Sequence, residues 1–163
     1  MRRCLSIFVL LWGFVVYSDV RPLVVASKDF NESYILGEMV AQTLESKGLS
    51  VERRFGLGGT LICFEALVAG EIDVYVEYTG TIEQAILKLP QRASVKQLNE
   101  QLKHRGLQLL SPLGFNNTYA LAMPEAAAEA RDLRRISQLK DQMGIRAMVS
   151  HEFLKREDGW PGL

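Results

Sequence analysis

The feature that most constrains the fold is a regular alternation of strand-like and helix-like segments in the first half of the chain. One helical segment follows Asn31, which we expect to cap it, and another runs from Leu61 to Ala69. Each is followed by a glycine, the residue that most often ends a helix. Because the connections are short, we expect parallel strands joined by right-handed crossovers, and therefore an α/β fold. The expected strands are Pro22–Ala26, Val51–Phe55 and Ile72–Val76.

The second half of the chain follows a looser pattern. Helices are expected over 82–89, 94–105 and 125–135, and shorter ones start at Ser137 and near His151. Further extended segments are expected between these helices. They are Leu107–Leu113 and Tyr119–Met123, and a further strand is expected at Ile145–Val149.

The N-terminus has the pattern of an export signal. Arg2 and Arg3 precede an apolar run from Cys4 to Tyr17 that contains no charge. This run has about 14 residues, whereas a membrane-spanning helix needs about 20. We interpret residues 1–18 as a cleaved signal peptide and expect the mature chain to start near Asp19. The alternative is an N-terminal membrane anchor.

Composition excludes several classes of function. Lysine plus arginine and aspartate plus glutamate number 19 each, so the charge balance does not favour a nucleic-acid partner. The only histidines, His104 and His151, show no metal-ligand spacing and are expected on the surface. Cys63 lies in an apolar helical run, where a buried, unreactive thiol is the simplest interpretation. We therefore expect no metal and no cofactor.

Carboxylates near the third expected strand do not form a catalytic arrangement. Asp73 and Glu77 alternate along the strand, but no nucleophile or histidine lies near them in the sequence. We interpret them, together with Glu65 and Glu71, as hinge, cap or surface groups. The chain is not expected to be an enzyme.

The residues from Tyr78 to Thr81 follow the third strand and combine an aromatic ring with hydroxyl groups. Small ligands bind at the carboxyl ends of strands in open α/β sheets. A quaternary ammonium group has no proton to donate, so aromatic ring faces recognise it, at about 0.5–2 kcal/mol per ring. Tyr78 and Tyr119 are the candidates, and the alternative for each is a half-buried core tyrosine. Tyr34 and Tyr75 fit that alternative better.

Two cationic residues are candidates for binding a ligand carboxylate. Lys28 follows the first strand, near the start of a helix, and Arg156 lies four residues after Glu152. The alternative for the second pair is a solvated helix salt bridge. Gly58-Gly59-Thr60 lacks the further residues of a phosphate-binding loop, so we expect it to provide a tight turn near the ligand.

Several longer motifs, in order along the chain, resemble one known family. They resemble the substrate-binding component of the ABC transporters for osmoprotectants, namely glycine betaine, carnitine, choline and proline betaine. The resemblance extends from Leu23 to Leu163. The motifs are Val25–Glu32, Gly58–Thr60, Phe64–Leu67, Gly70–Asp73, Glu77–Thr81, Gly114–Ala120, Glu152–Leu154 and Arg156–Gly159.

The resemblance implies the type II periplasmic-binding-protein fold, in which two α/β lobes with a hinge close on a solute. We expect residues 19–111 to belong to lobe 1 and residues 112–163 to lobe 2. The strands that cross between the lobes are expected near Leu109–Gly114. Because the chain ends at Leu163 without a closing helix or strand, we expect it to be truncated within the second lobe.

The resemblance also implies roles for individual residues. Tyr78 and Tyr119 match tyrosines of the aromatic cage, and Lys28 and Arg156 match residues that hold the ligand carboxylate. Ser33 stands where many members have glutamine, which puts one polar contact in doubt. Three further positions match residues that face the ligand, and these are Thr81, Asn117 and Glu152.

The expected function is extracytoplasmic, in the periplasm: capture of a quaternary ammonium ligand and its delivery to an ABC transporter permease. The alternatives are a ligand-sensing domain of the same fold and a non-functional gene fragment. Micromolar binding needs about 8 kcal/mol. Two rings and one or two charge-assisted hydrogen bonds barely supply that before entropic costs. We therefore expect this chain alone to bind weakly or not at all.

Overall fold

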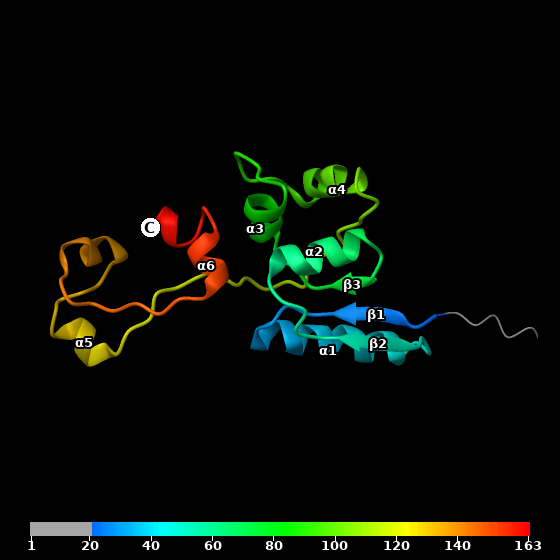
Figure 1. Cartoon of the computed structure of the whole chain (residues 1–163), viewed down its shortest axis with the longest axis horizontal. Helices are drawn as coiled ribbons and strands as arrows, with labels where there is room; N and C mark the ends of the chain where they lie inside the picture. The colour runs from blue at the N-terminus through cyan, green and yellow to red at the C-terminus, as the bar shows by residue number, and fades with distance from the viewer. Residues whose placement is uncertain (1–20) are drawn as a thin grey trace, which may run out of the picture.

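A computed structural model describes residues 21–163, and the expected signal peptide lies outside these residues. A three-stranded parallel sheet has the order β2-β1-β3 (Figure 1). The central strand is almost fully buried, as expected for its unbroken apolar sequence. The expectation of a parallel α/β unit is confirmed. The strands are β1 (Leu23–Ala26), β2 (Val51–Arg54) and β3 (Val74–Tyr75).

Two helices lie on opposite sides of β1 (Figure 1). They are α1 (Asn31–Glu45) and α2 (Thr60–Val68). Phe30, in an extended conformation, precedes α1, and Asn31 is already its first helical residue. No side chain caps this helix, so the expectation that Asn31 is the cap is wrong.

A second apolar cluster lies beyond β3, where Phe64 of α2 packs with Ile82, Leu98 and Leu102. The segment expected as a helix over 82–89 is instead a π-helix that ends at Ile86, and a short α-helical turn precedes it. The next helix begins with a capping box, in which the Ser94 side chain accepts from the backbone N–H of Gln97. These elements are α3 (Thr79–Thr81), η1 (Ile82–Ile86) and α4 (Val95–Lys103).

The remaining residues form short helices and extended segments without further strands in the described part of the chain. The strand expected at 145–149 is therefore wrong, and the extended segments expected at 107–113 and 119–123 pair with no strand. A strand needs a hydrogen-bonding partner and a covered face, whereas Leu110 and Met148 in these segments are largely exposed. The helix expected to reach Arg135 ends at Glu129 instead. The elements are α5 (Glu125–Glu129), η2 (Ile136–Asp141), α6 (His151–Lys155) and η3 (Trp160–Gly162).

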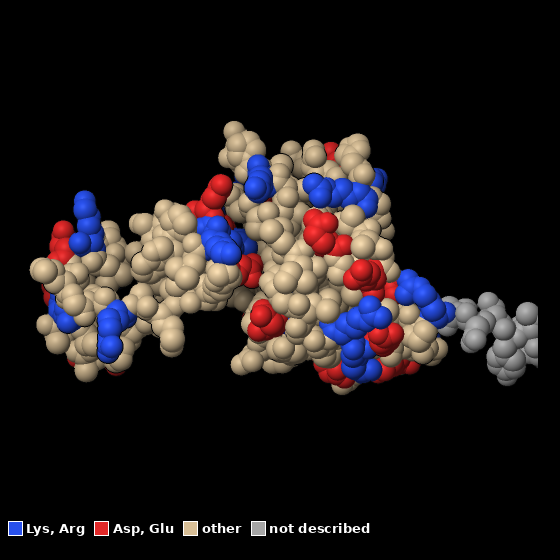
Figure 2. All heavy atoms as spheres, in the orientation of Figure 1, with Lys and Arg blue, Asp and Glu red and all other residues tan. Residues whose placement is uncertain are grey.

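Other expectations for single residues are confirmed. Cys63 is fully buried, and burial raises the pKa of its thiol to about 11. His104 and His151 are exposed. On the face shown in Figure 2, acidic and basic side chains are interspersed rather than gathered by sign. Within residues 21–163, no helix has the length and apolar character needed to cross a membrane.

Asp73 connects the start of β1 to the segment before β3. Its carboxylate accepts hydrogen bonds from Arg21 at 2.6 and 2.8 Å and from the backbone N–H of Val24 at 2.7 Å. The Arg21 hydrogen bonds, followed by the Val24 bond, hold the pKa of Asp73 below its ordinary value. A lowered pKa means that the folded state gains stability from the ionised group. That gain is complete above the unfolded-state pKa and is lost as the pH falls through the folded-state pKa.

We therefore expect Asp73→Asn to lower the free energy of unfolding by about 1 kcal/mol at neutral pH, since the Arg21 pair is exposed. The difference from wild type should shrink as the pH falls below about 4. Urea unfolding at several pH values measures it. Glu71→Gln is the matched control, because this exposed neighbour loses the same charge. A difference that stays constant into acid would contradict the expectation.

Candidate functional site

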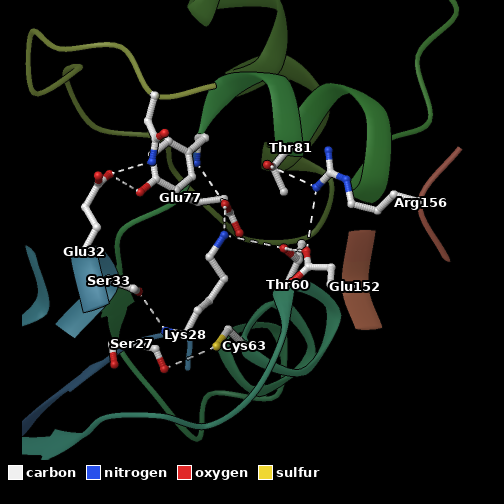
Figure 3. Close-up of polar contacts among 12 residues, drawn as sticks. Ser27, Lys28, Glu32, Ser33, Thr60, Cys63, Glu77, Thr81, Glu152 and Arg156 are labelled. Atoms are coloured by element: carbon white, nitrogen blue, oxygen red, sulfur yellow. Dashed lines mark hydrogen bonds and ion pairs between the residues drawn. The ribbon is translucent and has the colours of Figure 1, made fainter. Parts of the chain in front are cut away.

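The seven predicted site residues gather at the carboxyl ends of β1 and β3. Figure 3 labels four of them, namely Lys28, Thr81, Glu152 and Arg156. Contacts connect the first turns of α1, α2 and α3 to α6 and to the segment around Asn117. Residues far apart in the sequence therefore meet at one place. Lys28, Tyr78 and Thr81 come from the sheet-containing part of the chain. Asn117, Tyr119, Glu152 and Arg156 come from the part that follows.

Lys28 is held inside the protein by several partners. Its Nζ lies 2.6 Å from Glu77 Oε1 and 3.5 Å from Thr60 Oγ1, and its side chain is only 4% exposed. The ammonium group also lies 5.0 Å from the ring centre of Tyr78 and 5.4 Å from that of Phe30. This residue therefore has a counter-ion and aromatic contacts within the protein itself.

Glu77 is a central residue of the site, and its interpretation as a hinge, cap or surface group is wrong. Its side chain is 5% exposed, and Oε1 also accepts a hydrogen bond from the backbone N–H of Tyr78. Burial raises the pKa of Glu77, and the Lys28 ammonium counteracts that shift. The β1–β3 register pairs Val25 with Val74, which places residue 28 opposite residue 77. The sequence did not reveal this pairing, because it does not give the order of the strands in the sheet.

Tyr78 is fixed by Glu32, a residue that the sequence analysis missed. The Tyr78 hydroxyl donates to Glu32 Oε1 at 2.5 Å, and Asn117 Nδ2 donates to the same oxygen at 3.0 Å. Burial and the bond to Glu32 raise the pKa of Tyr78 to about 12. Glu32 stands in the first turn of α1. The sequence signal that could have pointed to Glu32 was its position as a carboxylate at the N-terminus of an expected helix.

Arg156 is buried among polar groups. Its side chain is 7% exposed, so the alternative of a solvated helix salt bridge does not fit. Its Nη1 lies 3.3 Å from Thr81 Oγ1 and 3.7 Å from Glu152 Oε1. Asp158, also missed by the sequence analysis, binds Nε at 2.8 Å and Nη2 at 2.6 Å. The arginine hydrogen bonds hold the pKa of Asp158 below its ordinary value.

The Gly58-Gly59-Thr60 turn brings α2 close to α6. Thr60 Oγ1 donates to Glu152 Oε1 at 2.6 Å. A Cβ on Gly59 would lie 3.2 Å from Glu152 Oε2, and Gly58 has φ +137°, which favours glycine. The expectation of a tight turn near the site is confirmed in its geometry.

The other tyrosines, Tyr119, Tyr75 and Tyr34, lie in three different surroundings. Tyr119 is 55% exposed, with its ring 4.8 Å from that of Phe153 and 5.8 Å from Arg156 Cζ. Tyr75 packs against a core cluster, as expected. Tyr34 was also expected in the core, but it is 39% exposed on α1, where its ring contacts Phe55. It is nevertheless not among the residues that contact the site.

The site carries more negative than positive groups. Lys28 and Arg156 are the cationic residues, and four carboxylates contact them or Tyr78. These are Glu32, Glu77, Glu152 and Asp158. An excess of carboxylates beside two tyrosines favours a cationic ligand group.

Aromatic and charged groups at the strand ends of a parallel α/β sheet are typical of a site for a small solute. The family of substrate-binding domains of ABC-type glycine betaine transport systems matches residues 21–163. The chain belongs to this family, which is a family of transport proteins and not of enzymes.

Individual relatives agree with this assignment. The ergothioneine transport permease/ergothioneine binding protein EgtU of Helicobacter pylori is 36% identical over 150 residues, which cover 89% of this chain and 27% of that protein. A glycine-betaine-binding protein of Pseudomonas aeruginosa is 39% identical over 129 residues, covering 75% of this chain and 40% of that protein.

Among solved structures, apo YehZ from Escherichia coli matches with a TM-score of 0.57 and 30% identity, covering 87% of this chain and 54% of that one. The expected periplasmic-binding-protein fold is therefore confirmed. This chain spans between about a quarter and a half of the length of these three relatives.

Proposed function

We propose that this chain is the solute-binding component of an ABC importer for quaternary ammonium osmoprotectants of the glycine betaine or choline type. Glycine betaine and ergothioneine, the ligands in the names of two relatives, both carry a trimethylated ammonium group and a carboxylate. The observation that carries the proposal is the gathering of Tyr78, Tyr119 and an excess of carboxylates at the strand ends.

In this proposal the ligand's methylated head lies against the rings of Tyr78 and Tyr119. The negative face of a ring attracts the cation without any hydrogen bond, and a dry surrounding strengthens that attraction. The remainder of the ligand is surrounded by polar side chains. These are Lys28, Thr81, Asn117, Glu152 and Arg156.

The proposed mechanism is closure of two lobes, residues 19–111 and 112–163, about a hinge near Leu109–Gly114. Three polar contacts across the proposed boundary support it, because they would be made and broken as the lobes move. They are Thr60–Glu152, Glu32–Asn117 and Thr81–Arg156. The closed form would dock on the permease outside the cytoplasmic membrane, in the periplasm.

A titration of the ¹⁵N-labelled chain with glycine betaine tests the proposal. We expect saturable NMR shift changes at Tyr78, Tyr119 and their neighbours, with a dissociation constant in the millimolar range, because two rings and one or two charged contacts supply only a few kcal/mol. Glycine, which lacks the three methyl groups, is the control ligand. Shift changes of equal size with glycine would contradict the proposal.

A further inference from the structure

One oxygen of Glu32 joins two segments of the chain that are far apart in the sequence. Glu32 Oε1 accepts a hydrogen bond from the Tyr78 hydroxyl at 2.5 Å and another from Asn117 Nδ2 at 3.0 Å. These donors lie 46 and 85 residues away along the chain. The carboxylate is half-buried, so water competes for it only in part. Its position is therefore fixed from two directions.

The start of α1 brings this carboxylate to Tyr78. Glu32 is the second residue of α1, a helix of 15 residues whose N-terminus favours a negative charge. Phe30, in an extended conformation just before the helix, has its ring centre 6.4 Å from that of Tyr78. The beginning of α1 therefore contacts Tyr78 both at its ring and at its hydroxyl group.

The bond to a carboxylate changes the charge distribution of the Tyr78 ring. The pKa of Tyr78 is raised to about 12, so near neutral pH the hydroxyl keeps its proton and is the donor. A hydrogen bond to an ionised acceptor is stronger than one to a neutral acceptor, and it polarises the donor group. The phenol oxygen therefore gains negative charge and passes part of it to the ring.

A more negative ring face attracts a cation more strongly. The Tyr78 ring faces a positive group within the protein itself, because Lys28 Nζ lies 5.0 Å from the ring centre. An uncharged ligand group of the same size gains nothing from the added charge of the ring. The effect of Glu32 is therefore expected in the preference for charge, and not in the fit of the ligand's shape.

We propose that Glu32 is a positioning residue that sets the preference of the site for a cation, because its carboxylate orients the Tyr78 ring and raises the electron density of that ring. This inference rests on the proposed function, since it concerns the methylated cation of the same ligand. Glu32 acts through the Tyr78 hydroxyl and does not itself touch the ligand.

The test measures the ratio of the affinities for glycine betaine and for 3,3-dimethylbutanoate, its isostere with an uncharged carbon in place of nitrogen. Glu32→Gln keeps a hydrogen-bond acceptor but removes the charge, and it should lower this ratio by about threefold. Glu38→Gln removes the same charge from α1 at a residue that binds Arg53, and it should change the ratio by less than about 1.5-fold. An unchanged ratio in Glu32→Gln would overturn the inference.

A direct attraction between Glu32 and the ligand would give the same result, and the Tyr78→Phe background separates the two causes. Tyr78→Phe keeps the ring and removes the hydroxyl group through which Glu32 is proposed to act. In this background Glu32→Gln should change the ratio by less than about 1.5-fold. A fall as large as in the wild-type background would show a direct attraction and overturn the inference.

A measurement without ligand separates this inference from the proposed function. In NMR spectra of the ¹³C-tyrosine-labelled chain at neutral pH, the Cζ resonance of Tyr78 should be displaced toward the position of a phenolate. Glu32→Gln should return it toward the position of free tyrosine. An unchanged resonance in Glu32→Gln would overturn this inference alone, even where glycine betaine binds. Failure of both ligands to bind wild type, with the expected Cζ response, would overturn the proposed function and the ligand preference with it.

Discussion

Glu77→Ala is expected to lower the free energy of unfolding by about 3–5 kcal/mol, because it leaves the Lys28 ammonium buried without its counter-ion. Both side chains of this pair are at most 5% exposed, so water cannot replace the missing carboxylate. Their contact of 2.6 Å also joins the ends of β1 and β3. Urea unfolding followed by circular dichroism measures the change.

Two further variants make this prediction specific. Glu52→Ala breaks the exposed Glu52–Arg54 pair, whose side chains are 46% and 43% exposed, and should cost less than about 1 kcal/mol. Combining Glu77→Leu with Lys28→Met removes both charges and should recover much of the loss, as replacement of buried ion pairs by apolar residues often does. A Glu77→Ala variant within about 1 kcal/mol of wild type would contradict the assignment.

Tyr78→Ala is expected to weaken glycine betaine binding by about tenfold or more. The ring supplies about 0.5–2 kcal/mol of attraction for the methylated cation, and its loss also opens the site to water. Its position depends on the bond to Glu32, which Asn117 shares. The measurement is the same NMR titration that tests the proposed function.

The controls separate the ring from the hydroxyl group. Tyr34→Ala removes a tyrosine of α1 that contacts Phe55 and should leave the affinity unchanged. Tyr78→Phe keeps the ring but loses the hydrogen bond to Glu32. Its affinity for glycine betaine should therefore lie between those of wild type and Tyr78→Ala. Equal losses in Tyr34→Ala and Tyr78→Ala would count against the cage assignment.

Local sequence patterns predicted the first half of the fold, and they named residues that the structure brings together as a candidate site. Apolar runs, helix periodicity and terminal glycines marked β1, α1, α2 and β3, because each element is decided by its own residues. The strand expected at 145–149 was wrong for the opposite reason. Extended backbone becomes a strand only when a partner pairs with it, and sequence periodicity does not reveal the partner.

The site was predicted through its conspicuous residues, and its supporting residues were missed. Tyrosines and cations at strand ends attract attention, whereas Glu77 becomes the partner of Lys28 only through the pairing of β3 with β1. Glu32 and Asp158 accept hydrogen bonds from Tyr78 and Arg156, respectively. Such roles depend on contacts between segments, which residue type and spacing alone do not specify.

The most direct test of the account compares glycine betaine with 3,3-dimethylbutanoate, in which an uncharged carbon replaces the quaternary nitrogen. Both ligands have the same shape and the same carboxylate, so only the positive charge at the aromatic rings differs. We expect glycine betaine to bind at least about tenfold more tightly, as the attraction of a cation to ring faces requires. Equal affinities in the NMR titration would contradict recognition of a methylated cation by Tyr78 and Tyr119.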